Sequence, residues 1–467
     1  MQVTVIGTGY VGTVTGVCLA YLGHQITCVD TDAAKIERLA RGESPIYEPM
    51  LEEMIALAAE RGGVSFTTAL QDAVAASDVI FIAVGTPPLA SGEANLTFLE
   101  AAAKAIGHAM DNRRFRVVVN KSTVPVGSGN LVETLVREGI RDAGRTGPIH
   151  FGVASNPEFL REGSAVADSL YPDRIVVGGD PETLAVMREL YEPIVAQSFS
   201  PPAGVPRPAS MISVPLLATS LTSAEMIKYA ANAFLAMKIG FANEMANICE
   251  RVGAEAPEVM AGIGLDSRIG ARFLNPGVGW GGSCFGKDIH ALIHTAREYG
   301  YSSRLLEATL EVNAAQRQMV IQKLQEKLFI LKGRTVGLLG LAFKPDTDDL
   351  RDAPSLHIAE RLLQMGARVK AYDPVANDAC AQQRPDLKIR FCGTAQELAA
   401  GSDALVLVTE WRQFQELDLP ALASVMSSPV LVDGRNFFTP ETARAAGFDY
   451  SGIGRAARSR ANALAQA

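Results

Sequence analysis

The stretch Val3–Gly12, which reads Val-Thr-Val-Ile-Gly-Thr-Gly-Tyr-Val-Gly, decides the fold of the first part of the chain. Its apolar beginning, Val3–Ile6, predicts a short buried strand, and Gly7-Thr8-Gly9-Tyr10-Val11-Gly12 matches the G-x-G-x-x-G pattern of a dinucleotide-binding turn. The next predicted strand ends in Asp30, so the pattern stands in the context that this fingerprint requires. The glycines permit a tight turn, and the following helix N-terminus attracts a pyrophosphate. We therefore predict a Rossmann domain that binds NAD, against the alternative of a glycine-rich turn without a nucleotide.

Asp30 favours NAD over NADP, because its carboxylate would accept hydrogen bonds from ribose hydroxyls and repel a 2′-phosphate. Two further loops follow predicted strands, at the sheet edge where ligands of such folds bind. Thr86 in Val84–Pro88 and Thr123 in Lys121–Pro125 are candidate cofactor contacts. Ordinary turn chemistry would explain both threonines equally well.

Alternation of short apolar runs with amphipathic segments predicts an α/β fold with a parallel, doubly wound sheet covered by helices on both faces. The expected strands are Val3–Ile6, Gln25–Asp30, Val79–Val84, Val117–Asn120, Phe151–Ser155 and Arg174–Val177. Expected helices between them are Ala33–Ala40, Leu96–Ala109 and Leu131–Glu138.

The pattern restarts at Arg334 and predicts a second Rossmann-like domain, with strands at Thr335–Gly340, Arg368–Asp373, Ala404–Thr409 and Val430–Asp433. Gly337-Leu338-Leu339-Gly340 lacks the full fingerprint, and Phe343-Lys344-Pro345-Asp346 stands in place of the phosphate turn. This domain either binds a different nucleotide or is purely structural.

The middle of the chain predicts helices. Residues Ser200–Pro215 look like a surface insertion or a linker, and a long helix is expected over Ser223–Val252 with Ser223 as its N-cap. Because apolar residues cover several faces of this helix, it suits both a spine between domains and a subunit interface. Further helices are expected over Cys284–Tyr299 and Ser303–Leu328. The predicted domains are 1–205, 206–325 and 326–467.

Composition excludes several function classes. The 467 residues are 48% hydrophobic and 20% charged, which is typical of a soluble protein with more than one core. A net charge of −8 argues against nucleic acid or an anionic membrane as the partner. We expect no signal peptide, no transmembrane helix and no metal site. The six cysteines are scattered without a C-x-x-C pair, so we expect a cytoplasmic protein with reduced thiols.

Cys284 differs from the other cysteines, because it follows the glycine-rich run Gly279–Gly282 and opens a predicted helix. With Ser283 as N-cap, the positive end of the helix dipole would favour the thiolate. Lys287 adds a cation, and Asp288 projects from the same face one turn on. A thiolate beside a carboxylate can attack a carbonyl and manage a proton. A small buried thiol at a helix start is the alternative.

Two more sets of polar residues are candidates. Lys228 and Asn232 lie one turn apart on the otherwise apolar long helix, where they could stabilise an oxyanion. The lysine could instead extend to solvent. Asn156–Gly163 follows a strand and carries Glu158 and Glu162, which could orient a sugar or activate water; a plain surface loop is the alternative.

The chain resembles the UDP-glucose 6-dehydrogenase family, within the wider UDP-glucose/GDP-mannose dehydrogenase superfamily. The motifs that carry the resemblance span nearly the whole chain: KSTVPVG (121–127), NPEFLREG (156–163), SAEMIKYAANAFLAMKI (223–239), DSRIGARFLNPGVGWGGSCFGKDI (266–289) and LAFKPDTDDLRDAPS (341–355). The resemblance implies an NAD domain, a central helical dimerisation region and a C-terminal UDP-binding domain. It also implies oxidation of UDP-glucose to UDP-glucuronate with two NAD and water.

The resemblance further implies roles for individual residues. Cys284 would be the nucleophile, Lys228 and Asn232 would stabilise the oxyanion, Asp288 and Thr123 would relay protons, and Glu158 would act in thioester hydrolysis. Positions implied to contact NAD are Gly7, Thr8, Gly9, Tyr10, Val11, Gly12, Asp30, Lys35, Thr86, Thr123, Glu162, Lys287 and Arg351. Positions implied to contact the sugar nucleotide are Glu158, Phe159, Leu160, Lys228, Asn232, Arg268, Phe273, Asn275, Gly277, Gly281, Phe343, Lys344 and Arg435. Arg268 would come from the second subunit of a homodimer or larger homo-oligomer.

Three alternatives stay open. The same chemistry could act on UDP-N-acetylmannosamine, UDP-N-acetylglucosamine or GDP-mannose. A single-step hydroxyacid dehydrogenase would share the two-domain build but would not need Cys284. A catalytically inactive NAD-binding regulator would be expected to have lost Cys284, Lys228 or Asp288, and all three are present.

Overall fold

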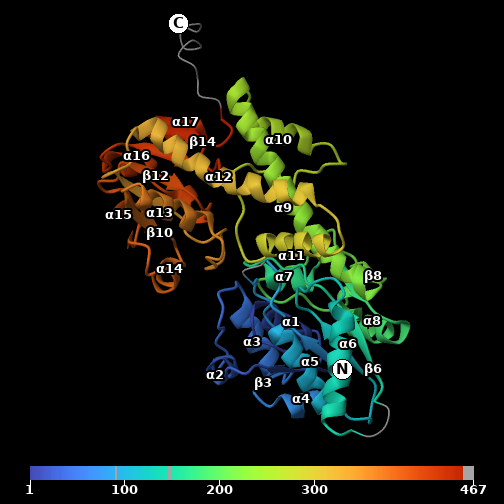
Figure 1. Cartoon of the computed structure of the whole chain (residues 1–467). Helices are drawn as coiled ribbons and strands as arrows, with labels where there is room; N and C mark the ends of the chain where they lie inside the picture. The colour runs from blue at the N-terminus through green and yellow to red at the C-terminus, as the bar shows by residue number, and fades with distance from the viewer. Residues whose placement is uncertain (90–91, 146–148, 456–467) are drawn as a thin grey trace. The chain divides into compact units, whose positions relative to one another are not determined.

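The computed structural model describes residues 1–89, 92–145 and 149–455, and the chain divides into two compact units. Unit 1 comprises Met1–Ala231 and His290–Gly300, and unit 2 comprises Asn232–Ile289 and Tyr301–Ala467. Helices α9 (Leu221–Val252) and α11 (Phe285–Glu298) each contribute to both units. Each unit contains one sheet with helices packed on it (Figure 1).

The sheet of unit 1 has the strand order β3-β2-β1-β4-β5-β6-β7-β8. Its pairings are parallel except between β6 and β7, which are antiparallel. The strands are β1 (Gln2–Ile6), β2 (Gln25–Val29), β3 (Val64–Thr67), β4 (Val79–Ile82), β5 (Arg116–Asn120), β6 (Phe151–Ser155), β7 (Ile175–Gly178) and β8 (Leu216–Thr219). Strand order reverses between β1 and β4, which is where a doubly wound sheet opens a crevice for a ligand.

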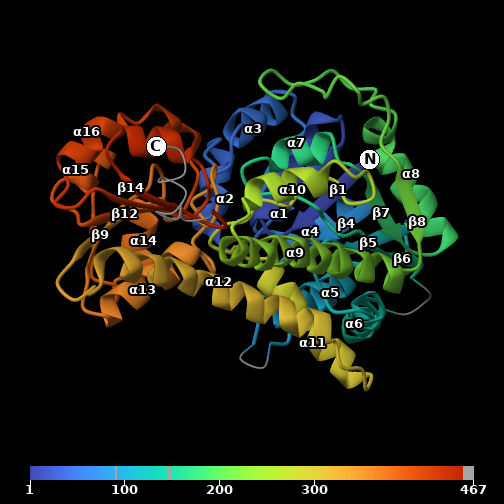
Figure 2. The same cartoon turned by 90° about the horizontal axis from the view of Figure 1, so that it is seen from above.

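Helices cover both faces of this sheet (Figure 2), because successive side chains of each buried strand point to opposite faces. Val79 and Phe81 of β4 belong to one apolar core, whereas Ile80 and Ile82 belong to the other. The helices are α1 (Tyr10–Tyr21), α2 (Ala33–Ala40), α3 (Leu51–Glu60), α4 (Leu70–Ala76), α5 (Thr97–Ala109), α6 (Ser128–Asp142), α7 (Ala165–Leu170) and α8 (Pro181–Val195).

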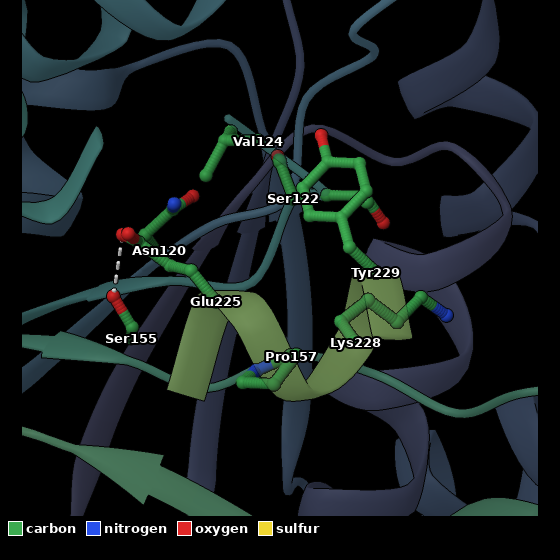
Figure 3. A pocket seen from close by; sticks show the side chains of 9 residues that line it. Asn120, Ser122, Val124, Ser155, Pro157, Glu225, Lys228 and Tyr229 are labelled. Atoms are coloured by element: carbon green, nitrogen blue, oxygen red, sulfur yellow. Dashed lines mark hydrogen bonds between the residues drawn. The ribbon is translucent and has the colours of Figure 1, made fainter. Parts of the chain in front are cut away.

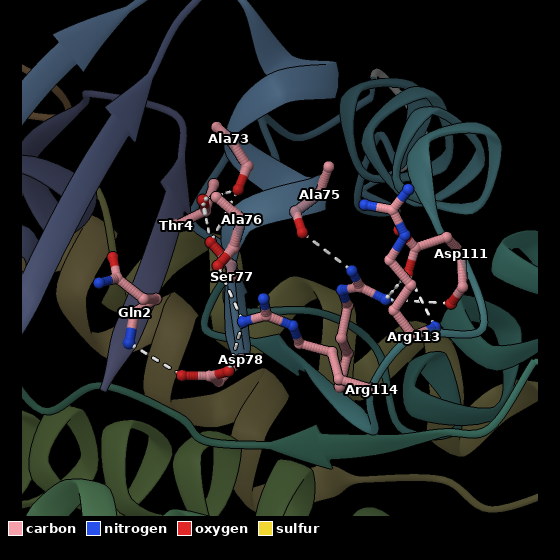
Figure 4. Close-up of polar contacts among 11 residues, drawn as sticks. Gln2, Thr4, Ala73, Ala75, Ala76, Ser77, Asp78, Asp111, Arg113 and Arg114 are labelled. Atoms are coloured by element: carbon pink, nitrogen blue, oxygen red, sulfur yellow. Dashed lines mark hydrogen bonds and ion pairs between the residues drawn. The ribbon is translucent and has the colours of Figure 1, made fainter.

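Polar side chains at the amino end of this sheet bind one another and nearby backbone (Figure 4). The Thr4 hydroxyl lies 2.6 Å from the Ser77 hydroxyl, and Asp78 accepts hydrogen bonds from the Gln2 N–H at 3.0 Å and from Arg114 at 2.9 Å. These groups are satisfied within the protein. The carboxyl end, by contrast, carries the predicted ligand residues.

The segment Ser200–Pro215 is not a linker between units, because it packs on unit 1. Val205 and Val214 are buried in the core, and the Tyr171 hydroxyl donates to the Val205 carbonyl at 3.0 Å. Strand β8 then extends the first sheet past the predicted boundary at residue 205. The division into two units does not test the three predicted domain ranges, which stay a proposal.

The sheet of unit 2 is entirely parallel, in the order β11-β10-β9-β12-β13-β14. Its strands are β9 (Thr335–Leu339), β10 (Arg368–Tyr372), β11 (Ile389–Phe391), β12 (Ala404–Leu407), β13 (Val430–Asp433) and β14 (Asp449–Gly452). Its helices are α10 (Ala256–Gly264), α12 (Arg304–Leu328), α13 (Pro354–Gln364), α14 (Asn377–Gln383), α15 (Ala395–Ala399), α16 (Leu419–Ser424), α17 (Pro440–Ala445) and the 3₁₀ helix Arg412–Glu416. The predicted fold class, two Rossmann-like domains with a long central helix, is confirmed.

Two predicted helix caps were wrong. Ser223 lies inside α9, which begins at Leu221, and the Ser220 hydroxyl accepts the Ser223 N–H at 3.1 Å. Helix α11 begins at Phe285, so Cys284 rather than Ser283 precedes its first residue. The Cys284 carbonyl accepts the Asp288 N–H at 2.9 Å, which is the first hydrogen bond of the helix.

Candidate active site

The three glycines of the Gly7–Gly12 turn have different tasks. Gly7 has φ +96°, and a Cβ there would lie 2.6 Å from the Ala83 carbonyl oxygen. A Cβ on Gly12 would lie 1.8 Å from the Gly7 carbonyl oxygen, so the turn and α1 pack only without it. A Cβ on Gly9 would meet no atom within 4 Å. Gly9 therefore leaves room beside the backbone at the start of α1, as a pyrophosphate requires.

Asp30 closes the same turn from the end of β2. Its Oδ2 accepts the Thr8 N–H at 2.8 Å, the Thr8 hydroxyl at 2.7 Å and the Lys35 ammonium at 3.3 Å. Burial raises the pKa of Asp30, but these bonds and the Asp32 N–H lower it more, so the pKa lies below its ordinary value. The structure thus brings together Thr8, Asp30 and Lys35, three of the positions that the resemblance implies for NAD.

The loops after β4 and β5 meet through their threonines. The Thr86 hydroxyl donates to the Thr123 carbonyl at 2.8 Å, so this donor already has a protein acceptor. Thr123 and Lys228 line one small cavity of unit 1, whose other lining residues are Asn120, Ser122, Val124, Ser155, Pro157, Glu225 and Tyr229 (Figure 3).

Glu158 and Lys228 form a buried ion pair. Nζ of Lys228 lies 2.9 Å from Oε1 of Glu158, and their side chains are 5% and 7% exposed. Oε2 of Glu158 accepts the Leu160 N–H at 2.7 Å. Burial raises the pKa of Glu158, but the Lys228 ammonium and the Leu160 N–H lower it more, so the carboxyl titrates below its ordinary range. The loop of Glu158 also carries Phe159, whose ring lies 5.4 Å from Nζ of Lys228.

Cys284 is the half-buried exception among six cysteines, since the other five are buried. Burial raises the pKa of Cys18 and of Cys28 to about 12, which keeps those thiols protonated. Sγ of Cys284 lies 3.4 Å from the Ser283 hydroxyl at the start of α11. A helix start favours a negatively charged sulfur, so the setting suits a nucleophile.

Asp288 lies one turn further along α11 and is fully buried. Its Oδ1 accepts from the Lys287 ammonium at 2.5 Å, and its Oδ2 accepts from the Asn232 amide at 2.6 Å. Lys228 and Asn232 were predicted to act as a pair. However, Lys228 binds Glu158 within unit 1, whereas Asn232 binds Asp288 within unit 2. Each of these two α9 side chains therefore holds a different carboxylate.

The remaining predicted substrate positions of unit 2 lie mostly on loops. A Cβ on Gly277 would lie 2.8 Å from the Gly434 carbonyl, and one on Gly281 would lie 2.3 Å from the Asp352 carbonyl, so packing requires both glycines. Arg435 donates to the Gly279 carbonyl at 3.2 Å. The other positions divide into partly buried Phe273, Phe343 and Lys344 and exposed Arg268 and Asn275.

Family models match most of the chain. Residues 1–195 match the NAD binding domain of the UDP-glucose/GDP-mannose dehydrogenase family, residues 222–315 its central domain and residues 337–440 its UDP binding domain. The chain belongs to this family. The UDP-glucose 6-dehydrogenase YwqF of Bacillus subtilis is 44% identical over 458 residues, which cover 98% of each chain. The UDP-glucose 6-dehydrogenase of Pseudomonas aeruginosa is also 44% identical, over 97% of this chain and 98% of that protein.

Solved structures place the same fold across the family. A UDP-glucose dehydrogenase from Pyrobaculum islandicum has a TM-score of 0.86 and 39% identity, covering 97% of this chain and 98% of that one. A UDP-D-ManNAc dehydrogenase from Pyrococcus horikoshii has a TM-score of 0.82 and 25% identity, covering 97% of this chain and 99% of that one. This family member therefore uses NAD, and the open turn at Gly9 fits that cofactor.

Across residues 1–89, 92–145 and 149–455, no helix is both long and apolar enough to cross a membrane. The same residues hold no group of three or more His, Cys, Asp or Glu side chains placed to bind a metal ion.

Sequence reasoning missed Glu48, which joins the cofactor turn of this dehydrogenase to the loop of Glu158. The Tyr10 hydroxyl donates to Glu48, and Glu48 accepts the Gly163 N–H at 2.6 Å and the Ala165 N–H at 2.7 Å. Glu48 is 7% exposed. It lies outside every motif, so the sequence offers no signal beyond an acidic residue in a loop.

Sequence reasoning also missed a row of polar residues on α12, which holds the loop before Cys284. Asn313 accepts the Trp280 N–H at 2.8 Å and donates to the Trp280 carbonyl at 3.0 Å. Gln316 donates to the Gly277 carbonyl at 2.8 Å, and Arg317 donates to the Trp280 carbonyl at 2.9 Å. These polar residues are spaced along one face of an expected helix, which is a signal that the sequence does contain. A polar helix face usually lies against solvent, so the spacing alone does not predict a buried contact.

Proposed function

We propose that this chain is a UDP-glucose 6-dehydrogenase, which oxidises the C6 alcohol of UDP-glucose to a carboxylate through a thioester on Cys284. The observation that carries the proposal is the half-buried Cys284 at the start of α11, with Lys287 and Asp288 in the first turn. An enzyme that stops at the aldehyde would not need a nucleophile there, whereas oxidation to the acid is eased by covalent trapping.

The Gly7–Gly12 turn, Asp30, Lys35 and Thr86 would hold NAD, which would supply the hydride acceptor for each oxidation. Once the C6 alcohol has become an aldehyde, the Cys284 thiolate adds to its carbon and forms a C–S bond. Donors at the carbonyl oxygen stabilise the negative charge that forms there, a task that suits Lys228 and Asn232. Loss of a second hydride from the same carbon leaves a thioester.

Hydrolysis then adds water to the thioester, breaks the C–S bond, and releases the carboxylic acid and the Cys284 thiolate. Glu158 and Asp288 are carboxylates that can take the protons released, with the Thr123 hydroxyl as a relay. Glu162, Lys287 and Arg351 are assigned to the cofactor. The remaining predicted substrate positions, including Phe159, Leu160 and Arg435, are assigned to the sugar nucleotide.

The test is NADH release against a panel of sugar nucleotides: UDP-glucose, UDP-N-acetylmannosamine, UDP-N-acetylglucosamine and GDP-mannose. Two NADH per UDP-glucose are expected. Preference for another sugar nucleotide would assign the same chemistry to that substrate, and one NADH per substrate would contradict a two-step oxidation.

The variant Cys284→Ser tests the covalent step. Serine could attack the aldehyde, but its ester should hydrolyse slowly, so the variant should stall after partial oxidation. Cys249→Ala, at a buried cysteine of α9, is the matched control and should turn over normally. Steady production of UDP-glucuronate by Cys284→Ser would refute the thioester.

We also propose that the enzyme is a homodimer or larger homo-oligomer that associates through α9. Phe234, Phe241 and Ile248 are spaced seven residues apart, on one face of α9, and are 57%, 46% and 46% exposed. Such an apolar stripe is typical of a subunit interface. Arg268, whose side chain is 87% exposed, would then reach the partner's substrate.

Light scattering should give a dimer or a larger assembly, and Phe241→Lys should shift it towards monomer. A monomeric wild-type protein would refute this assembly.

We also propose that the chain has three domains, with the ranges 1–205, 206–325 and 326–467. We further propose a cytoplasmic location, which cell fractionation tests.

A further inference from the structure

A second buried lysine belongs to the surroundings of Glu158. Lys121, the first residue after β5, is 9% exposed, and its Nζ donates to Oδ1 of Asn156 at 3.0 Å. Tyr191 of α8 donates its hydroxyl to the same oxygen at 2.5 Å. Asn156 stands two residues before Glu158, so Lys121 holds the start of the loop that carries this carboxylate.

The charges around Lys121 come from two other elements. Glu158 of the loop after β6 attracts the ammonium, Lys228 of α9 repels it, and Tyr191 of α8 faces it as a neutral phenol. Lys228 is the ion-pair partner of Glu158, whereas the ammonium of Lys121 donates to Asn156 and, at 3.4 Å, to the Tyr191 hydroxyl. A buried lysine is costly without compensation, because burial favours its neutral form.

The effect on each group follows from these charges. Burial lowers the pKa of Lys121, Glu158 raises it and Lys228 lowers it, to about 8. In return, Lys121 is one of the groups that lower the pKa of Glu158. Lys121 therefore favours the ionised form of the carboxylate that binds Lys228.

We propose that Lys121 is a positioning residue of the dehydrogenase, whose ammonium holds the loop of Glu158 through Asn156 and adds a second positive charge near this carboxylate. The inference rests on the proposed function, since it explains how Glu158 stays able to accept a proton during thioester hydrolysis. Lys121 acts through Glu158 and Asn156 and is not itself assigned a contact with substrate.

The decisive experiment is a ¹³C NMR titration of the Glu158 carboxyl in glutamate-labelled enzyme, with its signal identified by Glu158→Gln. In Lys121→Met the midpoint should rise by about one pH unit, because a nearby positive charge is lost. Lys121→Arg should keep the wild-type midpoint. Tyr191→Phe removes a hydrogen bond to Asn156 but no charge, so it should also leave the midpoint unchanged. An unchanged midpoint in Lys121→Met would overturn the proposal.

Turnover gives the second readout. With UDP-glucose and NAD, the acid limb of the pH profile of kcat should move to higher pH by about one unit in Lys121→Met, by the same amount as the Glu158 midpoint. A merely structural role would lower the thermal stability and leave the pH dependence of kcat as in wild type, and that result would also overturn the proposal.

If Lys121→Met does not fold, Lys121→Gln takes its place in both experiments. In the wild-type enzyme, the ε-carbon signal of Lys121 should titrate at a pH of about 8. A wild-type enzyme that makes no NADH from UDP-glucose would refute the proposed function, while the titration of Glu158 would still decide the role of Lys121.

Discussion

Each of the two sheets has an aspartate directly after its second strand, but the two aspartates make different contacts. These residues are Asp30 after β2 and Asp373 after β10. Each accepts backbone N–H groups from the turn after the first strand: Asp30 from Thr8, and Asp373 from Leu341 and Ala342 at 2.7 and 3.0 Å. The repeated contact shows that the aspartate first of all shapes this turn.

The difference lies in what else each carboxylate binds. Asp373 also accepts the Trp411 indole N–H at 3.1 Å and the N–H groups of Val375 and Ala376, and it is 2% exposed. The side chain of Asp30 is 12% exposed and lies beside an open turn. Asp30 thus remains accessible for the proposed contact with a ribose, whereas Asp373 is fully engaged within unit 2.

The glycines directly after the first strand of each sheet are alike. A Cβ on Gly7, at φ +96°, would lie 2.6 Å from the Ala83 carbonyl oxygen, and a Cβ on Gly340, at φ +93°, would lie 2.3 Å from Cβ of Thr409. The two turns differ two residues later, where the first has Gly9 with open space beside it and the second has Ala342, which is 1% exposed. A repeated sheet architecture has kept the geometry of the turn in both units and the dinucleotide opening in the first.

Gly12→Ala should have the largest effect, because it breaks the first turn itself. The new Cβ would lie 1.8 Å from a backbone oxygen that cannot move without unfolding the turn. We expect loss of soluble, folded protein, measured by yield and circular dichroism. Gly23→Ala, at an exposed glycine with no atom near its Cβ, is a milder control despite its φ of +102°. Native stability in Gly12→Ala would contradict this packing.

Asp373→Ala should cost several kcal/mol of unfolding free energy, because each buried N–H left without an acceptor costs about 1–3 kcal/mol. Urea unfolding measures this loss. Asp30→Ala, the equivalent change in unit 1, should cost less, since Asp30 is nearer to solvent and accepts fewer backbone N–H groups. Equal losses in the two variants would remove the distinction between a saturated and an accessible aspartate.

Gly9→Ala should leave stability nearly unchanged and weaken NAD binding, because the new methyl group meets no protein atom and enters the space assigned to the pyrophosphate. We expect KM for NAD to rise about tenfold, as for loss of roughly 1.4 kcal/mol of binding, with the melting temperature within error of wild type. A fall in melting temperature without a change in KM would show that Gly9 is a packing residue like Gly12.

The sequence was sufficient for the first turn and not for the second. Gly7–Gly12 and Asp30 are spaced as a local fingerprint, so strand, turn and helix could be predicted together. The full set of bonds to the second aspartate includes the indole of Trp411, which reaches Asp373 only after β12 has paired with β9. The same limit hid Lys121, because a lysine after a strand shows its partner only when β5, β6, α8 and α9 have packed.

The partners of the site residues could not be predicted from local spacing. Lys228 and Asn232 lie one turn apart on α9, and each binds a carboxylate that is distant in sequence. Their action on an oxyanion stays a prediction. Cys284 was predicted one position inside its helix, because the N-cap preference of serine favoured Ser283. The spacing of Cys284, Lys287 and Asp288 did not depend on that error.

Asp30→Asn should have the smallest effect and the most specific one. The amide keeps one oxygen acceptor but loses the charge that repels a 2′-phosphate, so use of NADP relative to NAD should rise several-fold. Stability gives a second readout. Because the folded-state pKa of Asp30 lies below its ordinary value, the ionised carboxylate stabilises the protein above a pH of about 4, and this contribution is lost as the pH falls through the lowered pKa. The difference in melting temperature between wild type and Asp30→Asn should therefore shrink on acidification. A difference that stays constant down to a pH of about 2 would show that Asp30 contributes through hydrogen-bond geometry alone.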